Sequence, residues 1–197
     1  CRLLPPPYLP ERRIEFIGNS ITCGYGVEST DPKEGFSDET ENHYYTYAAI
    51  TARNLKAQHL VVARSGIGIY RNYAGPKTGS KDNMPSMYNQ TLFGVKNERW
   101  DFSRYTPDVV CVNLGTNDVS TDPYDRDFLE NGYQNFYKRL RTYYPNAKIV
   151  FLSGSMLTGQ RLEHVQYALD NVVREARIAG DKEVYRFDMS WQTGELG

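Results

Sequence analysis

Short apolar runs alternate along this chain with longer segments whose apolar residues recur at helical spacing. The runs predict five strands, at Arg13–Gly18, Gln58–Ala63, Pro107–Leu114, Ala147–Ser153 and Glu183–Asp188. The periodic segments predict three helices, at His43–Lys56, Asp125–Tyr144 and Arg161–Ala179. Strands and helices that alternate in this way predict an α/β fold, with a parallel sheet that has helices on both faces.

The apolar positions of each predicted helix indicate which side chains it buries. Asn42 is a possible cap for the first helix, and Gly180 is expected to end the last one. The expected apolar positions are Tyr47, Ile50 and Leu55 in the first helix, Phe128, Tyr133, Phe136, Tyr137 and Leu140 in the second, and Leu162, Val165, Leu169, Val172 and Ala176 in the third.

Two segments fall outside this alternation. Residues 1–12 contain Pro5-Pro6-Pro7 and Pro10, which predict a stiff, extended lead-in of the kind that joins one domain to another. Residues 13–197 then form one domain, and a further domain upstream is plausible. Residues 64–106 are rich in Gly, Asn, Ser and Tyr and lack clear periodicity. A loop of that length inside a compact domain usually builds a binding surface.

Polar clusters follow the first three predicted strands, at residues 18–20, 64–66 and 115–118. Because the carboxyl ends of parallel strands meet at one edge of a sheet, we expect these clusters to converge. Ser20 would attack a carbonyl there, while its own N–H, the N–H of Gly66 and the side-chain amide of Asn117 would hold the oxyanion. Each cluster alone is more typical of a turn or a cap, but the three in order favour an acyl-transfer site.

Composition narrows the possible functions. The 197 residues carry a net charge of −1 and are 40% hydrophobic, which excludes a disordered chain and gives no electrostatic footprint for nucleic acid or an anionic membrane. No apolar run approaches the roughly 20 residues of a membrane span. No cluster has metal-ligand spacing, and Gly75–Ser80 lacks the spacing of a phosphate loop, so we expect neither a metal nor a cofactor.

The chain contains 16 tyrosines, whose flat apolar faces and polar tips suit sugars. Most of them are expected to be packing residues. Tyr25, Tyr70, Tyr73 and Trp191 are candidates for a sugar platform, because they lie near the site segments in the sequence. Among the three cysteines, a Cys1–Cys23 disulfide is possible, and Cys111 is expected to be a buried free thiol.

Three stretches of the chain, "IEFIGNSITCGYG", "ARSGIGIYRNY" and "VVCVNLGTND", resemble the first three conserved blocks of the SGNH (GDSL-type) hydrolases. The amino-acid sequences of the first stretch and of the "YRNY" segment resemble carbohydrate esterase family 2 more closely. The resemblance spans roughly residues 11–190. It implies a flavodoxin-like three-layer α/β/α sandwich with a five-stranded parallel sheet. The implied activity is removal of O-acetyl groups from plant polysaccharides such as xylan and glucomannan.

The resemblance also implies the setting of the domain. Its partner would be an acetylated polysaccharide or oligosaccharide, and an N-terminal β-sandwich would precede it in the full-length protein. Its place would be outside the cell, in the periplasm or on the cell surface. Two alternatives stay open: another SGNH activity, such as a lipase-like enzyme or a peptidoglycan O-acetylesterase, and a non-catalytic carbohydrate-binding domain.

Carried over residue by residue, the resemblance makes Ser20 the nucleophile and Gly66 and Asn117 the oxyanion donors, with Gly68 a less favoured donor. The family usually has Asp where this chain has Asn19, a change that removes a negative charge but still allows the turn to be capped. Asp118 is expected to brace the third turn.

The family takes its general base from a D-x-x-H segment after the fifth strand, and this chain ends at "SWQTGELG", where that segment should begin. Its histidines, His43, His59 and His164, lie in no such motif. We therefore expect the base beyond residue 197, because a serine hydroxyl is a weak nucleophile until a base takes its proton. Asp188, which closes the fifth strand, is expected to be structural.

Overall fold

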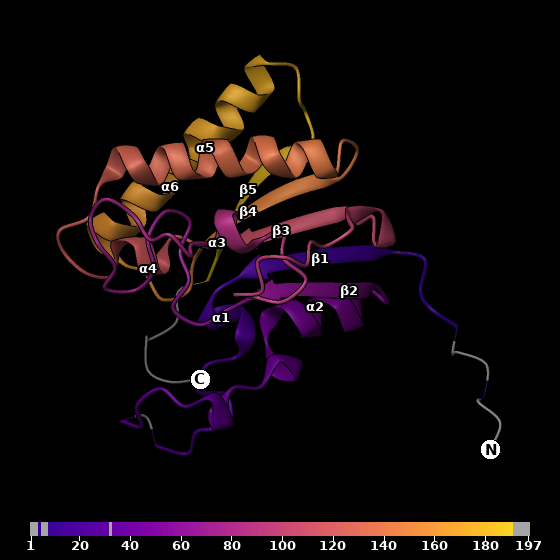
Figure 1. Cartoon of the computed structure of the whole chain (residues 1–197), viewed down its shortest axis with the longest axis horizontal. Helices are drawn as coiled ribbons and strands as arrows, with labels where there is room; N and C mark the ends of the chain where they lie inside the picture. Colours follow the sequence, from indigo (N-terminus) through magenta and orange to yellow (C-terminus); the bar gives the residue numbers. More distant parts are fainter. Residues whose placement is uncertain (1–3, 5–7, 32, 191–197) are drawn as a thin grey trace.

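A computed structural model describes residues 4, 8–31 and 33–190 of the chain. Its centre is a sheet of five parallel strands in the order β2-β1-β3-β4-β5 (Figure 1). The strands are β1 (Arg13–Gly18), β2 (Gln58–Ala63), β3 (Val109–Asn113), β4 (Lys148–Gly154) and β5 (Val184–Met189). All five lie where the hydrophobic pattern predicts them, with ends that differ by at most two residues.

Helices cover both faces of this sheet. The helices are α1 (Ser20–Cys23), α2 (Tyr47–Asn54), α3 (Met84–Met87), α4 (Thr116–Val119), α5 (Arg126–Tyr143) and α6 (Gly159–Ile178). Short 3-10 turns occur at Asp38–Thr40, His43–Tyr45 and Phe102–Arg104. Helices α5 and α6 lie on one side of the sheet and α2 on the other (Figure 1). This is the flavodoxin-like three-layer sandwich that the resemblance implies.

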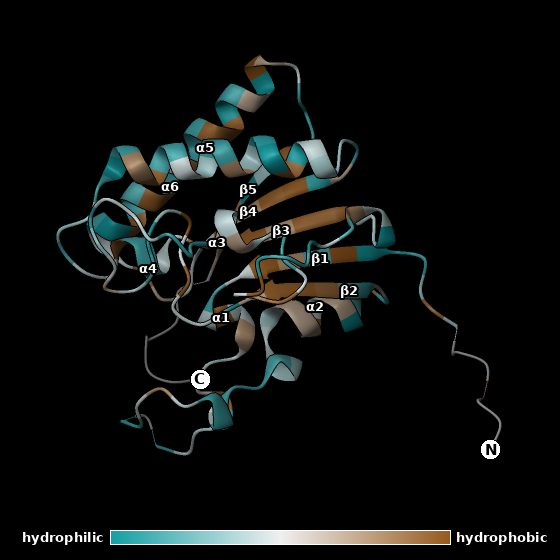
Figure 2. Cartoon of the chain, in the orientation of Figure 1, coloured by the Kyte–Doolittle hydropathy of each residue, from teal (hydrophilic) through white to brown (hydrophobic). Residues whose placement is uncertain are grey.

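Alternation along the strands divides the core into two clusters. In β1, Ile14 and Phe16 pack with Ala48 and Ala52 of α2, whereas Ile17 belongs to the larger cluster that includes α5 and α6. The central strands are accordingly apolar on both faces, and the long helices α5 and α6 carry most of their polar residues on the outside (Figure 2). The larger cluster also contains Val110, Val112, Ile149, Phe151, Tyr133, Phe136, Leu140, Val165, Leu169 and Val172.

Helix α2 departs from the prediction at its start and in its buried face. Asn42 caps the preceding 3-10 turn, since its side chain accepts the Tyr44 N–H at 2.9 Å, and Thr46 caps α2 itself. The buried face consists of Ala48, Ala49 and Ala52. Small side chains let the helix lie close to the sheet, so the larger Ile50 and Leu55, which we expected to be buried, are 40% and 45% exposed.

The two long helices follow the pattern more closely. Helix α5 buries Tyr133, Phe136 and Leu140 as predicted, but Leu129 takes the place expected for Phe128, which is 45% exposed. Tyr137 is half-buried. In α6 the predicted stripe packs into the core, with Leu162 at its half-buried end. The helix ends just before Gly180, as expected.

The segment 64–106 folds over one flank of the sheet. It contains α3, a 3-10 turn and an antiparallel bridge between Gln90 and Arg99. Met84, Met87 and Tyr88 from this segment are buried in the larger core cluster. The segment is therefore an ordered cover rather than a passive loop. In the part of the chain that the structure describes, no helix is both long and apolar enough to cross a membrane.

Candidate active site

The register of the sheet brings the three predicted turns together. Gly18, the last residue of β1, lies opposite Ala63 of β2 and opposite Asn113 of β3. The chain therefore leaves all three strands on one row, at the carboxyl edge of the sheet. The strand order reverses between β1 and β3, and such a switch point is where open α/β sheets bind ligands.

Ser20 begins helix α1 immediately after β1. Asn19 caps this helix, because its side-chain oxygen accepts the Ile21 N–H at 3.1 Å and its carbonyl accepts the N–H groups of Thr22 and Cys23. Asn19 is fully buried, so it holds the turn from the interior of the protein. The Ser20 N–H has no acceptor in the described part of the chain, and Ser20 itself is partly exposed. Both the side chain and the backbone N–H of Ser20 remain available to a ligand.

Gly66 and Gly68 differ in what their N–H groups do. The Gly68 N–H donates to Asn72 Oδ1 at 3.2 Å, so it is already in use. The Gly66 N–H meets no acceptor among the described residues, and the Gly66 carbonyl accepts the Tyr73 N–H at 2.8 Å. The backbone at Gly66 has a φ of +79°, which favours glycine. The geometry favours Gly66 over Gly68 as the second oxyanion donor.

Asn117 links the third turn to the second. Its side-chain amide donates to the carbonyl of Ile67 at 2.8 Å, and the residue is only 7% exposed. Because Ile67 follows Gly66 directly, this bond holds the amide group of Asn117 beside the Gly66 turn. An Asn amide has two N–H donors, so one donor remains after the bond to Ile67.

Asp118 and Arg71 tie the same two turns together from the inside, and we call them the Asp118–Arg71 clamp. The fully buried carboxylate of Asp118 accepts the N–H groups of Ile69, Tyr70 and Arg71 at 2.8–3.0 Å. Arg71 Nε donates to the Asp118 carbonyl at 2.7 Å, and its guanidinium also donates to the carbonyl of Pro123. Asp118 therefore braces the third turn as predicted, and it braces the second turn as well.

The sequence gives no signal for Arg71, since arginine is normally exposed. Here its side chain is only 2% exposed, because carbonyl groups from two loops surround the guanidinium.

The four predicted sugar-platform residues differ in their surroundings. Tyr73 is 62% exposed and lies next to Gly66 through its backbone hydrogen bond. Tyr25 is half-buried and stacks on the exposed ring of Phe36, with centroids 5.6 Å apart and planes 13° apart. Trp191 lies outside the described residues.

Tyr70 is a correction to the prediction. It is only 6% exposed, it belongs to the larger core cluster, and its hydroxyl accepts the Asp125 N–H at 2.9 Å. Its ring packs against Phe128. Tyr70 is therefore a packing residue, because the tight turn at residues 69–71 that Asp118 holds points it inward.

The three histidines are engaged elsewhere. His43 Nδ1 lies 2.6 Å from the carbonyl of Thr22, and its Nε2 lies 3.3 Å from His59 Nε2. His164 Nδ1 lies 2.7 Å from the hydroxyl of Tyr124. None of the three has a hydrogen bond to Ser20 among the described residues.

Asp188 and the cysteines take no part in the cluster. The neighbouring guanidinium of Arg186 lowers the pKa of Asp188, and Ser153 donates to the same carboxylate, which gives Asp188 the structural role expected of it. Cys111 is a free thiol, and Cys23 forms no disulfide with a described cysteine. Burial raises the pKa of Cys111 to about 12, so this thiol is unreactive. Cys1, and with it the possible Cys1–Cys23 disulfide, lies outside the described residues.

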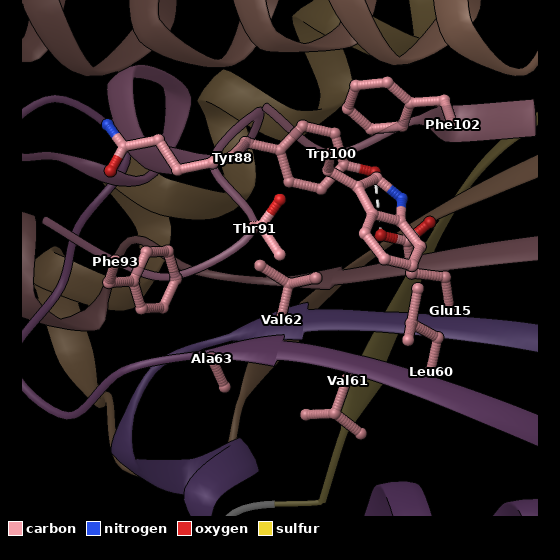
Figure 3. Close-up of a pocket in the computed structure, with 11 residues that line it drawn as sticks. Glu15, Leu60, Val61, Val62, Ala63, Tyr88, Thr91, Phe93, Trp100 and Phe102 are labelled. Carbon is pink, nitrogen blue, oxygen red and sulfur yellow. Dashed lines mark hydrogen bonds between the residues drawn. The ribbon is translucent and has the colours of Figure 1, made fainter. Parts of the chain in front are cut away.

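A cavity of about 180 Å³ lies on the flank of the sheet, between β2 and the cover formed by segment 64–106 (Figure 3). Val62, Phe93 and Trp100 line it, and the buried carboxyl of Glu15 lies at its side. Tyr88 donates to Glu15 Oε1 at 2.8 Å, whereas Oε2 has no partner. Desolvation raises the pKa of Glu15 to about 7. None of the predicted site residues lines this cavity, so it is separate from the Ser20 cluster.

At the Ser20 cluster, a serine hydroxyl, two backbone N–H groups and an amide follow three strands that end on one row of the sheet. The profile of the GDSL-like lipase/acylhydrolase family matches residues 16–192, which includes all of these groups. The chain belongs to this family. The fold and the order of the three blocks are those that the resemblance implies.

Two relatives of the chain carry the name of an esterase. The whole chain is 43% identical to part of the cellulase/esterase CelE of Acetivibrio thermocellus, of which it covers 24%. It is 36% identical over 163 residues, 81% of its length, to an acetylxylan esterase / glucomannan deacetylase of Cellvibrio japonicus, of which it covers 44%. The chain thus spans less than half the length of these relatives.

A solved structure of a carbohydrate esterase is also similar to this chain. The whole chain superposes with a TM-score of 0.91 and 42% identity on a family two carbohydrate esterase from Clostridium thermocellum in complex with cellohexaose. It covers 59% of that chain. The neighbours in sequence and in structure are therefore family 2 carbohydrate esterases, as the "YRNY" segment predicts.

Proposed function

We propose that this domain carries the serine nucleophile and the oxyanion donors of a carbohydrate O-acetylesterase. The observation that supports this most directly is the set of available N–H groups in three turns that follow strands ending on one row. The backbone N–H groups of Ser20 and Gly66 have no acceptor within the described chain, and one N–H of Asn117 remains after its bond to Ile67. Three available donors that converge with a serine would form the environment that a tetrahedral acyl intermediate needs.

In the proposed reaction, Ser20 Oγ attacks the carbonyl carbon of the acetyl ester and gives its proton to a general base. The carbonyl oxygen becomes an oxyanion, which accepts hydrogen bonds from the N–H groups of Ser20, Gly66 and Asn117. The C–O bond to the sugar then breaks, and the sugar oxygen takes the proton from the base. Water, activated by the same base, attacks the acetyl-serine and releases acetate.

The general base is proposed to be a histidine beyond residue 197, in the segment that follows β5. Two observations support this. The three histidines of the chain bond to other groups, namely His43 to Thr22, His59 to His43, and His164 to Tyr124. Strand β5 is parallel to β1 and ends at the same carboxyl edge of the sheet, so a histidine shortly after it can approach the Ser20 cluster.

The proposed substrate is an acetylated polysaccharide of the xylan or glucomannan type, or an oligosaccharide from one. The names of the relatives support this class, and Tyr73 offers an exposed aromatic ring next to Gly66. Aromatic faces of this kind suit the apolar faces of sugars. A polymeric substrate also favours a location outside the cell, in the periplasm or on the cell surface, and an upstream β-sandwich domain stays part of the proposal.

The test is acetate release by the full-length protein from acetylated glucomannan and from 4-nitrophenyl acetate. We expect Ser20→Ala to lower kcat by at least about 1,000-fold, because loss of the nucleophile leaves only binding and the oxyanion donors. A serine-reactive phosphonate should label Ser20 in the wild type and not in the variant. Unchanged acetate release by Ser20→Ala would falsify the proposal.

A non-catalytic glycan-binding domain is the second candidate, because no histidine of this chain bonds to Ser20 in the described structure. This candidate predicts that the full-length wild type binds cellohexaose but neither releases acetate nor reacts with the phosphonate. The esterase proposal predicts both acetate release and labelling, so the two measurements separate the candidates.

A further inference from the structure

His43 and His59 face each other on the side of the molecule that carries α2, and neither has a hydrogen bond to Ser20, Gly66 or Asn117 among the described residues. His43 comes from the 3-10 turn before α2, and His59 comes from strand β2. Their Nε2 atoms lie 3.3 Å apart, and their ring centroids lie 5.4 Å apart. His59 is exposed and His43 is half-buried, so solvent reaches the pair.

This separation matches the spacing of two metal ligands. Imidazole nitrogens bound about 2.05 Å from one tetrahedral ion lie roughly 3.3 Å apart. An ordinary N–H hydrogen bond is shorter, at about 2.9–3.0 Å. The pair thus lies at the long end of the hydrogen-bond range and has the spacing at which an ion fits between the nitrogens.

The orientation of His43 is fixed in the manner of a metal ligand. Its Nδ1 lies 2.6 Å from the carbonyl of Thr22, a distance at which the Nδ1–H donates to that oxygen. The proton on Nδ1 leaves the lone pair on Nε2, which is the atom that faces His59. Metal-binding histidines commonly donate their other N–H to a backbone carbonyl in this way.

His59 is held as firmly. It is the second residue of the edge strand β2, opposite Ile14 of β1, and its ring packs edge-on against Phe16 with centroids 6.4 Å apart. Desolvation, together with the nearby His43 and Arg53, lowers the pKa of His59.

We propose that His43 and His59 form a binding site for one divalent transition-metal ion. Imidazole ligands suit Cu²⁺, Ni²⁺ and Zn²⁺, and Cu²⁺ is expected to bind most tightly of the three. No third histidine, cysteine or carboxylate joins the pair within the described residues, so water would fill the remaining positions on the ion. Because His43 donates to Thr22, a bound ion would fasten α1, the helix that begins with Ser20, to the edge strand β2.

The test uses the untagged protein and titrates Cu²⁺, Zn²⁺ and, as a hard cation that prefers oxygen ligands, Mg²⁺. We expect one Cu²⁺ per chain in calorimetry and no Mg²⁺ binding at the pair. His59→Asn and His43→Asn should each weaken Cu²⁺ binding at least about tenfold. His164→Asn is the matched control, because it removes the third and last histidine of the chain, and it should leave the affinity unchanged.

Two further readouts keep the outcome clear if a variant folds poorly. The wild type with Cu²⁺ should give an electron paramagnetic resonance spectrum with couplings from two imidazole nitrogens. Cu²⁺ should also raise the Tm of the wild type and of His164→Asn, but not that of His59→Asn. Coupling from a single nitrogen, equal losses in His164→Asn and His59→Asn, or full affinity in His59→Asn would each overturn the proposal. All of these readouts are independent of esterase activity.

Discussion

Two glycines in the second turn, Gly66 and Gly68, have different tasks although only one residue separates them. A Cβ atom at Gly66 would meet nothing closer than Tyr73, at 4.0 Å, but the φ of +79° strains any other residue. A Cβ atom at Gly68 would lie 1.8 Å from the carbonyl oxygen of Arg71 and 2.6 Å from Asp118 Oδ2. Gly66 is required by backbone conformation and Gly68 by close packing.

This difference predicts opposite profiles for two alanine variants. Gly66→Ala should cost about 1–2 kcal/mol of stability and lower kcat/KM by about 100-fold, because a shifted N–H no longer meets the oxyanion. Gly68→Ala should cost about 3 kcal/mol, since the clash involves backbone that cannot move freely. Urea denaturation and ester hydrolysis measure the two effects. Equal stability of the two variants would contradict this division.

Glu15 makes stability depend on pH. Its pKa is about 7 in the folded protein against 4.5 for the ordinary group, because burial disfavours the charged form. The folded state therefore binds the proton more tightly. The contribution of Glu15 to the free energy of unfolding is fully present below pH 4.5 and is lost as the pH rises through about 7.

Glu15→Gln should remove this dependence. Glutamine keeps the shape and stays neutral, so the variant should match the wild type at pH 4.5 and exceed it by about 3 kcal/mol at pH 8.5. Denaturant titrations at the two pH values measure the difference. The wild type and the variant having parallel pH profiles would show that Glu15 is not the group responsible.

The sequence predicts some of these residue roles and misses others. Asn19 is expected to cap a local turn, and it does, because a cap depends only on neighbours in the chain. Arg71 and Glu15 are not predicted to be buried, since charged residues are exposed by default. Their partners, such as Pro123 for Arg71 and Tyr88 for Glu15, lie 52 and 73 residues away in the chain.

Among the elements, strands are predicted better than loops for a physical reason. The central strands β1, β3 and β4 are largely buried on both faces, so their apolar runs show in the sequence whatever surrounds them. The face that α2 buries depends on how closely the helix approaches the sheet, which is a tertiary property. That is why Ala48 and Ala52 are buried and Ile50 is not. The fold of segment 64–106 likewise depends on distant contacts, above all on Asp118.

Asp118 offers a test of how firmly helix α4 is joined to the second turn. In Asp118→Asn, one carboxylate oxygen becomes an NH₂ group that faces backbone N–H donors. At least one bond is lost, and a buried donor stays unpaired, at a cost of about 2–3 kcal/mol. Urea denaturation measures this cost.

The matched control is Asp125→Asn, which makes the same chemical change at the cap of α5. Asparagine caps helices about as well as aspartate, so this variant should stay within about 0.5 kcal/mol of the wild type. A similar loss in both variants would mean that the charge, and not the position of Asp118, is responsible.

At the scale of the whole molecule, exposed aromatic rings occur both at the proposed active site and elsewhere. Tyr73 adjoins Gly66, whereas Tyr44 lies beside Arg53 on the α2 side, and the two rings are 62% and 58% exposed. If the ring of Tyr73 supports the sugar, its removal should affect large substrates and not small ones.

Tyr73→Ala should therefore raise KM for acetylated glucomannan by about tenfold, as expected when an aromatic contact is lost, and leave kcat/KM for 4-nitrophenyl acetate unchanged. Tyr44→Ala removes an equally exposed ring and should change neither value. Steady-state kinetics of the full-length protein give both numbers. A loss on the small ester as well would assign Tyr73 to the folding of its loop.

Strands β1, β2 and β3 end on one row, at Gly18, Ala63 and Asn113, and this limits how the sequence of such a domain can change in evolution. Removing one residue from β1 would turn the serine toward the opposite face of the sheet, since side chains alternate along a strand. Lengthening a surface loop leaves that row untouched and costs little chain entropy. Insertions at residues 27–41 or 74–82 can therefore change the substrate preference of the domain, while the lengths of β1, β2 and β3 stay fixed.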